Sequence, residues 1–377
     1  MPSSFEFIVL GGGIAGASAA YVLSRHGRVA LLEKESQCGF HSTSRSAAVL
    51  SCAYGPRSWQ ILSAASAGFY AEPPERFTET SLAKPLGALY LGSAHEEESL
   101  RMRAADLVER GVACELISTE TAGRMVPMVH MENFALALHE PGCVDLDTNA
   151  LLNGYLREAR RRGAKIMVKA EIGSITRSSS IWQIATGNET FEAPILIDSA
   201  GAWADEVAAR AGLPRRGLTP LRRTAITFAP PAGHEARRWP MTFDLAETWY
   251  LKPEGRQIMM SPADLVPTEP CDAQPDDYDI AVAIDRVESV TSLKVDRLNG
   301  RWAGLRTFAP DHEAVIGPDP EEPSFIWYAG QGGNGVMASR AAGEVCAALA
   351  LGENIPAPIA RLGLTKDMIS PARLKPL

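Results

Sequence analysis

The first 33 residues place apolar runs on either side of a glycine cluster. Residues 5–10 form an apolar run of strand length, residues 11–16 read GGGIAG, and residues 17–24 are rich in helix formers. A second apolar run, residues 28–32, ends at Glu33, which is 22 positions after Gly11. The pattern predicts a strand, a glycine turn, a helix and a second strand that ends in an acid.

Each glycine of this turn has a physical reason if a dinucleotide binds there. Gly11 permits the tight turn, Gly13 lets the backbone approach a pyrophosphate, and Gly16 lets the helix pack closely on the strand. The start of the helix supplies N–H groups and the positive end of its dipole. Glu33 accepts hydrogen bonds from a ribose diol and disfavours a 2′-phosphate, so the turn indicates NAD or FAD and not NADP.

A second glycine-rich turn near the C-terminus favours a flavin. The apolar runs at residues 195–198 and 325–329 predict two more strands, and the second is followed by GQGGNG at residues 330–335. This turn opens a predicted helix that runs to about residue 351. Such a helix start can direct N–H groups at the flavin edge where negative charge accumulates on reduction, a need that nicotinamide lacks.

The nucleotide motifs lie at both ends and in the middle of the chain, so two interleaved domains are expected. We expect a Rossmann-like FAD-binding domain from residues 1–85, 145–222 and 303–377. Residues 86–144 and 223–302 predict a mostly antiparallel substrate-binding sheet, with β-rich segments at 224–228, 248–252, 257–261 and 290–295. The fold class is α/β, or α+β over the whole chain.

Composition excludes several classes of protein. The 377 residues include 37 Lys and Arg against 45 Asp and Glu, a formal charge of −8, which argues against a nucleic-acid partner. The six cysteines are scattered without a Cys-x-x-Cys pair, so no metal site is indicated. We expect a soluble, cytoplasmic protein without a transmembrane segment or signal peptide.

Four stretches together resemble the FAD-dependent amino acid and amine oxidoreductases of the D-amino acid oxidase superfamily, and within it the bacterial D-arginine dehydrogenases. The stretches are residues 11–16 with Glu33, residues 41–48 with 53–55, residues 195–203, and residues 302–306 with 330–335. The resemblance implies an amino acid substrate and an electron acceptor that is oxygen, a quinone or an electron-transfer protein.

The resemblance also implies which residues bind FAD: the two glycine turns, the acid after the second strand and the hydroxylated loop after it. They are Gly11, Gly13, Ile14, Ala15, Gly16, Glu33, Lys34, His41, Ser42, Thr43, Arg45, Ser46, Ala47, Ala48, Ala170, Glu171, Ala200, Gly201, Trp203, Gly304, Arg306, Gly330, Gly332, Gly333, Asn334 and Gly335. Residues 304–307 contain no cysteine, and His41 also occurs in non-covalent relatives, so we expect FAD to be bound non-covalently.

The resemblance further implies a clamp for the substrate carboxylate. Arg306 matches the position that binds this group, Tyr250 matches the phenol that assists it, and Arg223 resembles a further arginine nearby. Tyr54 resembles a mobile residue over the pocket. An arginine fork fixes a carboxylate at two points, which lysine does not.

Two departures from the arginine-selective relatives bear on the substrate. Leu86 stands where they carry a glutamate after a proline, and Val49 stands where they carry a histidine; Gly333 is also expected in this pocket. Burying a guanidinium against Leu and Val without a carboxylate is costly. We therefore expect a neutral, hydrophobic D-amino acid, and the alternatives are a secondary amine or glycine substrate (sarcosine, glycine or proline) and a non-catalytic flavoprotein subunit.

Overall fold

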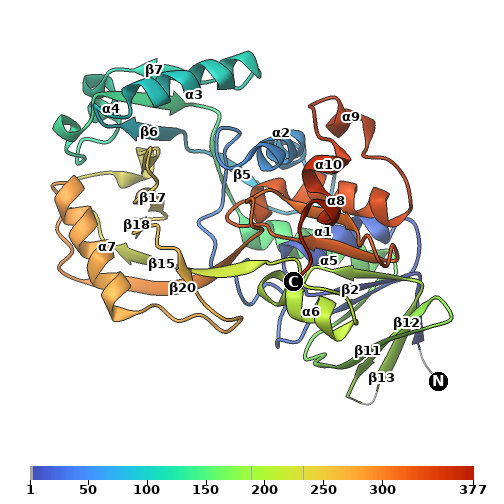
Figure 1. Cartoon of the computed structure of the whole chain (residues 1–377). Coiled ribbons are helices and arrows are strands. Elements are labelled where there is room, and N and C mark those ends of the chain that lie inside the picture. The colour runs from blue at the N-terminus through green and yellow to red at the C-terminus, as the bar shows by residue number, and fades with distance from the viewer. Residues whose placement is uncertain (1–2, 188, 232) are drawn as a thin grey trace.

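The structure is a computed structural model that describes residues 3–187, 189–231 and 233–377 (Figure 1). A six-stranded sheet forms one half of the molecule, with its strands parallel except for the last. Their order is β10 (Lys165–Met167), β3 (Val29–Leu32), β2 (Phe7–Leu10), β14 (Ile195–Asp198), β22 (Phe325–Ala329) and β21 (Val315–Pro318). The expected strands at residues 5–10, 28–32, 195–198 and 325–329 therefore lie in one sheet.

Helices cover one face of this sheet because their apolar sides form a single core with it. The helices are α1 (Ile14–Leu23), α2 (Arg57–Ala71), α5 (Thr148–Arg161) and α8 (Gly335–Ala350). All residues of α1 are buried. A Cβ at Gly343 of α8 would lie 3.0 Å from the Ser18 backbone of α1, so the two helices cross at close range.

The opposite face packs against a smaller sheet and a short helix. The four-stranded sheet has the order β1 (Ser3–Ser4), β13 (Glu189–Ala193), β12 (Ile181–Thr186) and β11 (Ile172–Ser178), and the helix is α6 (Ala204–Arg210). Trp182 and Phe191 enter the core on this side. The parallel sheet is thus buried on both faces, as its nearly continuous apolar strands predict.

A nine-stranded sheet forms the other half. Its path is β19 (Val266–Pro267), β15 (Thr219–Phe228), β18 (Gln257–Ser261), β17 (Tyr250–Glu254), β16 (Met241–Asp244), β6 (Ala88–Gly92), β8 (Leu136–Glu140) and β7 (Glu115–Ile117), with β20 (Leu298–Phe308) beside β15. Every pair is antiparallel except β16 with β6. Segments 86–144 and 223–302 thus share one sheet.

The prediction of a strand at residues 290–295 is wrong. Helix α7 (Asp277–Val290) occupies the start of this segment, and after it only Thr291 makes an isolated bridge, to Val129. Strands β15 and β20 pair from Thr219 with Phe308 to Phe228 with Leu298 and so run through the expected boundaries at 222/223 and 302/303. The division into two domains stays a prediction.

Short elements complete the chain. A three-stranded sheet has the order β4 (Val49–Leu50), β9 (Val144–Leu146) and β5 (Ala83–Pro85). The other helices are α3 (Glu97–Glu109), α4 (Thr119–Met125), α9 (Ala357–Ala360) and α10 (Lys366–Ile369), with 3₁₀ turns η1 (Met131–Asn133), η2 (Gly201–Trp203), η3 (Ala236–Arg238) and η4 (Pro371–Arg373).

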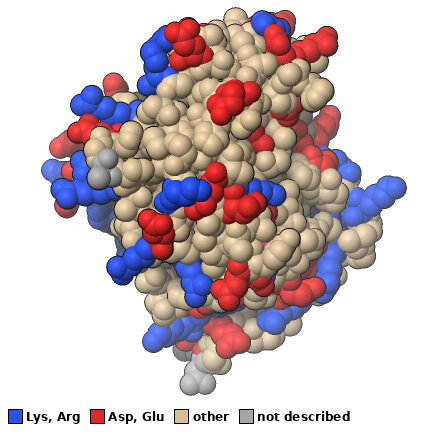
Figure 2. All heavy atoms as spheres, turned by 90° about the vertical axis from the view of Figure 1, so that its left-hand side faces the viewer, with Lys and Arg blue, Asp and Glu red and all other residues tan. Residues whose placement is uncertain are grey.

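The surface bears on the expectation about a nucleic-acid partner, and the helices bear on the expectation about a transmembrane segment. On the face drawn in Figure 2, Lys and Arg are interspersed with Asp and Glu and do not gather into a basic patch. Among the described residues, no helix combines the length and the apolar character that crossing a membrane requires.

Candidate FAD and substrate site

A cavity of about 340 Å³ lies between the two large sheets. One side is formed by residues at the carboxyl ends of the parallel strands, including Leu10, Leu32 and Ser199, which is where open α/β sheets bind ligands. The other side is formed by the nine-stranded sheet, through Ala225 of β15 and Met259 of β18. Both sheets therefore contribute to one site.

The first glycine turn has the geometry that its sequence predicts. Gly11 has a φ of +96°, and a Cβ there would lie 2.6 Å from the Ser199 carbonyl oxygen. A Cβ at Gly16 would lie 1.9 Å from the Gly11 oxygen, so only glycine lets α1 approach β2. The N–H of Ile14 donates to Thr43 Oγ1 at 3.0 Å, which ties the helix start to the hydroxylated loop.

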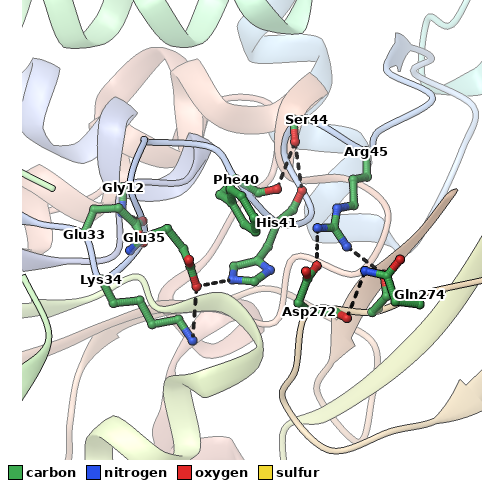
Figure 3. A network of polar contacts seen from close by, with 11 residues as sticks. Gly12, Glu33, Lys34, Glu35, Phe40, His41, Ser44, Arg45, Asp272 and Gln274 are labelled. Atoms are coloured by element: carbon green, nitrogen blue, oxygen red, sulfur yellow. Dashed lines mark hydrogen bonds and ion pairs between the residues drawn. The ribbon is translucent and has the colours of Figure 1, made fainter. Parts of the chain in front are cut away.

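Glu33 is buried beside this turn (Figure 3). Its Oε2 accepts the N–H of Gly12 at 2.7 Å, and its Oε1 accepts the N–H of Glu35 at 2.8 Å. Each carboxylate oxygen retains a further acceptor position. The residue that was expected to bind a ribose diol is thus fixed in place by the backbone.

His41 and Lys34 meet around Glu35 and Trp203. His41 Nε2 lies 2.9 Å from Glu35 Oε1, and its ring lies 4.7 Å from that of Trp203. Lys34 Nζ lies 3.7 Å from the same Glu35 oxygen, as Figure 3 shows, and 3.4 Å over the Trp203 ring. Lys34, His41 and Trp203 of this group line the cavity.

Arg45 lines the cavity but its guanidinium is engaged elsewhere. It donates to the carbonyl oxygens of Ala273 at 2.8 Å and Ala303 at 3.0 Å, and it pairs with Asp272 (Figure 3). Arg45 thus connects the loop between β19 and α7 to β20. The expected contact of Arg45 with a phosphate stays a prediction.

The second glycine turn brings the start of α8 to the same cavity. Gly332 has a φ of +53°, and its N–H donates to the Thr307 carbonyl oxygen at 2.8 Å. A Cβ at Gly333 would lie 2.9 Å from Arg306 Nη1. The guanidinium of Arg306 therefore lies directly on this turn, which leads into α8 at Gly335.

Most of the expected cofactor residues line this cavity, and four do not. The exceptions are Gly16, Ala48, Gly330 and Asn334. Gly16 acts in packing, and Ala48 lines a neighbouring cavity. Phe40, Thr307 and Gln331 line the cavity without having been predicted, although each adjoins a predicted motif.

The neighbouring, smaller cavity of about 40 Å³ shares a wall with the first. Arg306, Tyr250, Arg223 and Gly333 line both, and Tyr54 lines the smaller one. Arg306 Nη2 donates to the Tyr250 phenol oxygen at 3.3 Å. The three residues expected at the substrate carboxylate and the expected mobile residue Tyr54 therefore meet at one place, although they come from β20, β17, β15 and the loop after β4.

Arg223 and Arg222 differ as strand alternation predicts. Arg223 faces the cavities and donates through Nε to the Asp264 carbonyl oxygen at 2.8 Å. Arg222 points the other way, toward α7, where its Nη2 lies 2.8 Å from Asp279 Oδ2.

Glu247 is a residue of the smaller cavity that the sequence analysis missed. Tyr54 donates its hydroxyl to Glu247 Oε2 at 3.3 Å. The position of Glu247, three residues before Tyr250, was the one signal in the sequence that could have pointed to it. Most of the other residues that line this cavity are apolar, and they include Val49, Met241, Phe243, Trp249 and Met337.

Leu86 packs beside this region without lining either cavity. It is partly buried against the cluster that contains Phe243 and Tyr250, and its N–H donates to the Cys143 carbonyl oxygen at 3.2 Å. Its expected contact with the substrate side chain stays a prediction.

The electrostatics of the smaller cavity follow from its burial and its two arginines. Burial and the charge of Arg306 lower the pKa of Arg223. Burial also disfavours the charged form of Arg306, but Tyr250, Tyr54 and Glu247 together outweigh this effect and raise its pKa. Burial raises the pKa of the Tyr54 phenol, while the charge of Arg306 opposes that shift. Arginine stays protonated in proteins, so Arg223 and Arg306 bring two positive charges to this place, where the carboxylate of Glu247 acts on Arg306 and that of Asp264 acts on Arg223.

Asp198, at the end of β14, is fully buried behind the first turn. Its Oδ1 accepts the N–H of Ala200 at 3.1 Å, and its Oδ2 has no partner among the described residues. Burial raises the pKa of Asp198 well above its usual range. Among the described residues, no group of three or more His, Cys, Asp or Glu side chains is placed to hold a metal ion.

The cavity suits FAD because two helix starts, two glycine turns and a buried acid after the second strand converge on it. Fold and site define a dinucleotide-binding oxidoreductase with an adjoining pocket that two arginines line. The family model "DAO: FAD dependent oxidoreductase" matches residues 6–349, and the chain therefore belongs to this family of FAD-dependent oxidoreductases.

Individual proteins agree with this assignment. A glycine oxidase from Bacillus licheniformis is 25% identical and covers 94% of this chain and 95% of its own length. The crystal structure of L-proline dehydrogenase from P. horikoshii superposes with a TM-score of 0.86 at 22% identity, covering 99% of this chain and 98% of that one. The structure of L-α-glycerophosphate oxidase from Mycoplasma pneumoniae with FAD bound superposes with a TM-score of 0.82 at 18% identity, covering 93% of this chain and 95% of that one. The chain is thus an FAD-dependent oxidoreductase of this family, and its kinship with D-arginine dehydrogenases stays a prediction.

Proposed function

We propose that this chain oxidises a neutral, hydrophobic D-amino acid to its imino acid, which water hydrolyses to a 2-oxo acid and ammonia. The observation that carries the proposal is the wall shared by the two cavities, where Arg306, Tyr250 and Arg223 lie between the FAD cavity and an apolar one. When bound, FAD supplies the acceptor for the hydride that leaves Cα.

The protein's own residues hold the substrate still while this bond breaks. Arg306 offers a planar fork to the substrate carboxylate, and the Tyr250 hydroxyl, 3.3 Å from Arg306, is placed to donate to the same group. Arg223 adds a second positive charge nearby. Such two-point fixation directs Cα toward the flavin, and orientation of this kind lowers the barrier by restricting the bound substrate to reactive geometries.

The apolar wall supports a hydrophobic substrate side chain. Val49, Met241 and Trp249 carry no negative charge that could pair with a cationic side chain. Glu247 lies in the same cavity, but its negative charge already acts on Arg306 and its Oε2 accepts the Tyr54 hydroxyl. A guanidinium or ammonium side chain would lie near the positive charges of Arg223 and Arg306 without a free carboxylate to pair with among the described residues of this cavity, so D-Arg and D-Lys are disfavoured.

A second candidate is oxidation of glycine or a secondary amine. It is favoured by the named activities of two similar proteins, a glycine oxidase and an L-proline dehydrogenase. Such substrates carry the same carboxylate and would use the same clamp, whereas a small or cyclic substrate leaves the apolar wall uncovered.

Anaerobic bleaching of the flavin separates these candidates. The purified protein is mixed with D-Leu, D-Met and D-Phe, their L-enantiomers, D-Arg, D-Lys, glycine, sarcosine and L-Pro, and air is admitted afterwards. We expect the hydrophobic D-amino acids to bleach the flavin with the highest kcat/KM. Faster bleaching by glycine, sarcosine or L-Pro would establish the second candidate, equal bleaching by D-Arg would refute the proposed selectivity, and no bleaching by any compound would indicate a non-catalytic flavoprotein. Return of the colour in air would identify oxygen as an acceptor.

A further inference from the structure

A buried carboxylate lies behind the loop that carries Tyr54. Glu140 is the last residue of β8, in the nine-stranded sheet, and is 3% exposed. It does not line either cavity. Burial raises the pKa of Glu140, and hydrogen bonds from Ser51 and Cys52 oppose that shift. Burying a carboxyl group costs free energy unless the group is hydrogen-bonded.

The bonds of Glu140 hold the two residues that start this loop. Ser51 Oγ lies 2.6 Å from Glu140 Oε2, and the N–H of Cys52 donates to Oε1 at 2.8 Å. Ser51 Oγ also accepts the N–H of Ala53 at 3.2 Å. The chain immediately before Tyr54 is therefore attached to β8 through one carboxylate.

The same carboxylate contacts the aromatic stack on which Tyr54 rests. The Tyr54 ring is stacked on Phe243 at 6.0 Å, and Phe243 is stacked on Tyr90 at 5.1 Å. The Tyr90 hydroxyl lies 2.9 Å from Ser51 Oγ and 3.4 Å from Glu140 Oε2. Glu140 thus fixes both the backbone that leads to Tyr54 and the far end of its stack.

We propose that Glu140 is a positioning residue for the reaction, which holds Tyr54 over the substrate carboxylate by binding Ser51 and Cys52. The proposal takes one assumption from the proposed function, namely that Tyr54 contacts the substrate. It is distinct from the clamp, because Glu140 lines neither cavity and acts on the smaller one through the loop and through the stack of Tyr90 and Phe243.

The test is a double-variant cycle of Glu140→Gln with Tyr54→Ala. A glutamine has one amide oxygen, so it cannot accept from both Ser51 and Cys52 in the native arrangement, while its size is unchanged. We expect Glu140→Gln to lower kcat/KM about tenfold, equivalent to about 1.4 kcal/mol, chiefly through a higher KM. In the Tyr54→Ala background the same change should lower kcat/KM less than about twofold, because groups that act through one another are not additive. Equal losses in both backgrounds, or no loss in either, would overturn the proposal.

Two controls separate positioning from stability. Glu158→Gln changes another buried carboxylate, on α5, which bonds Arg161 at 2.9 Å away from both cavities; it should leave kcat/KM unchanged. Glu140→Asp should recover part of the loss. If Glu140→Gln does not retain FAD, Ser51→Ala takes its place in the cycle, because it removes one bond to Glu140 and leaves the Cys52 bond intact.

The cycle is run with whichever compound bleaches the flavin fastest, and also with benzoate, a carboxylate that is not oxidised, whose binding is followed by the flavin absorbance. If no compound bleaches the flavin of the unsubstituted protein, the proposed function fails. The dissociation constants of benzoate in the four proteins then still decide whether Glu140 acts through Tyr54, with non-additive losses supporting the inference and additive losses refuting it.

Discussion

Arg306→Lys tests the clamp most directly. The guanidinium donates to Tyr250 at 3.3 Å and lies against Gly333, where a Cβ would come within 2.9 Å of Nη1. Lysine retains the positive charge but replaces a planar fork by a single donor group. The substrate carboxylate should lose one charge-assisted hydrogen bond, which contributes about 1.5–3 kcal/mol. At 1.36 kcal/mol for each factor of ten, kcat/KM should fall about 10- to 150-fold.

The assay is anaerobic stopped-flow reduction of the bound flavin over a range of substrate concentrations. FAD content, measured by absorbance, should equal that of the unsubstituted protein. The matched control is Arg222→Lys, which changes an arginine that pairs with Asp279 and points away from both cavities. If Arg306→Lys reduces its flavin within twofold of the unsubstituted protein, or if Arg222→Lys loses as much, Arg306 does not bind the substrate carboxylate.

Three further changes have expected outcomes. Gly333→Ala should raise KM without lowering the melting temperature, because its Cβ would displace only the tip of Arg306, and unchanged kinetics would contradict this. Gly332→Ala should instead lower the melting temperature, since its φ is +53° and its Cβ would lie 2.6 Å from the Phe308 ring. The Asp198→Asn variant should gain stability relative to the unsubstituted protein as pH rises. Because the pKa of Asp198 is raised in the folded state, the unsubstituted protein loses stability as pH rises from the pKa of the unfolded state through that of the folded state, and asparagine does not titrate. Each unit of elevation is worth about 1.4 kcal/mol at high pH. A difference in melting temperature that is constant from pH 4 to pH 8 would contradict the raised pKa.

The parts of the fold that were predictable are those that local sequence specifies. An apolar run followed by glycine and a helix is determined within a few residues, and β2, α1 and β3 form where the pattern places them. The same holds for β22 and α8. Segment 290–295 contains Val290 and Val295 and predicts a strand by propensity, but its start completes α7, whose buried residues Ile280, Ala283 and Val287 recur with helical spacing.

The parts of the site that were missed depend on contacts between distant segments. The contact of Arg45 with Asp272, 227 residues away along the chain, was not expected. Glu140 and Ser51 are 89 residues apart. Neither pair has a local pattern, because register and loop packing decide them. Arg306 and Tyr250 were identified because each lies within a short motif that matches a known family.

The turn that carries Glu247 shows how the charge of the pocket is set. Glu247 has a φ of +54°, a left-handed conformation that costs a residue other than glycine about 1–3 kcal/mol unless its surroundings impose it. Asp244 imposes it, since its carboxylate accepts the N–H groups of Thr248 at 2.7 Å and Trp249 at 3.1 Å. Glycine would adopt this turn more readily, but it would remove the carboxylate that the Tyr54 hydroxyl contacts. The negative charge of Glu247 is thus held near Arg306, and that of Asp264 acts on Arg223. Under the proposed function, the carboxylate of the substrate adds a further negative charge beside the two arginines.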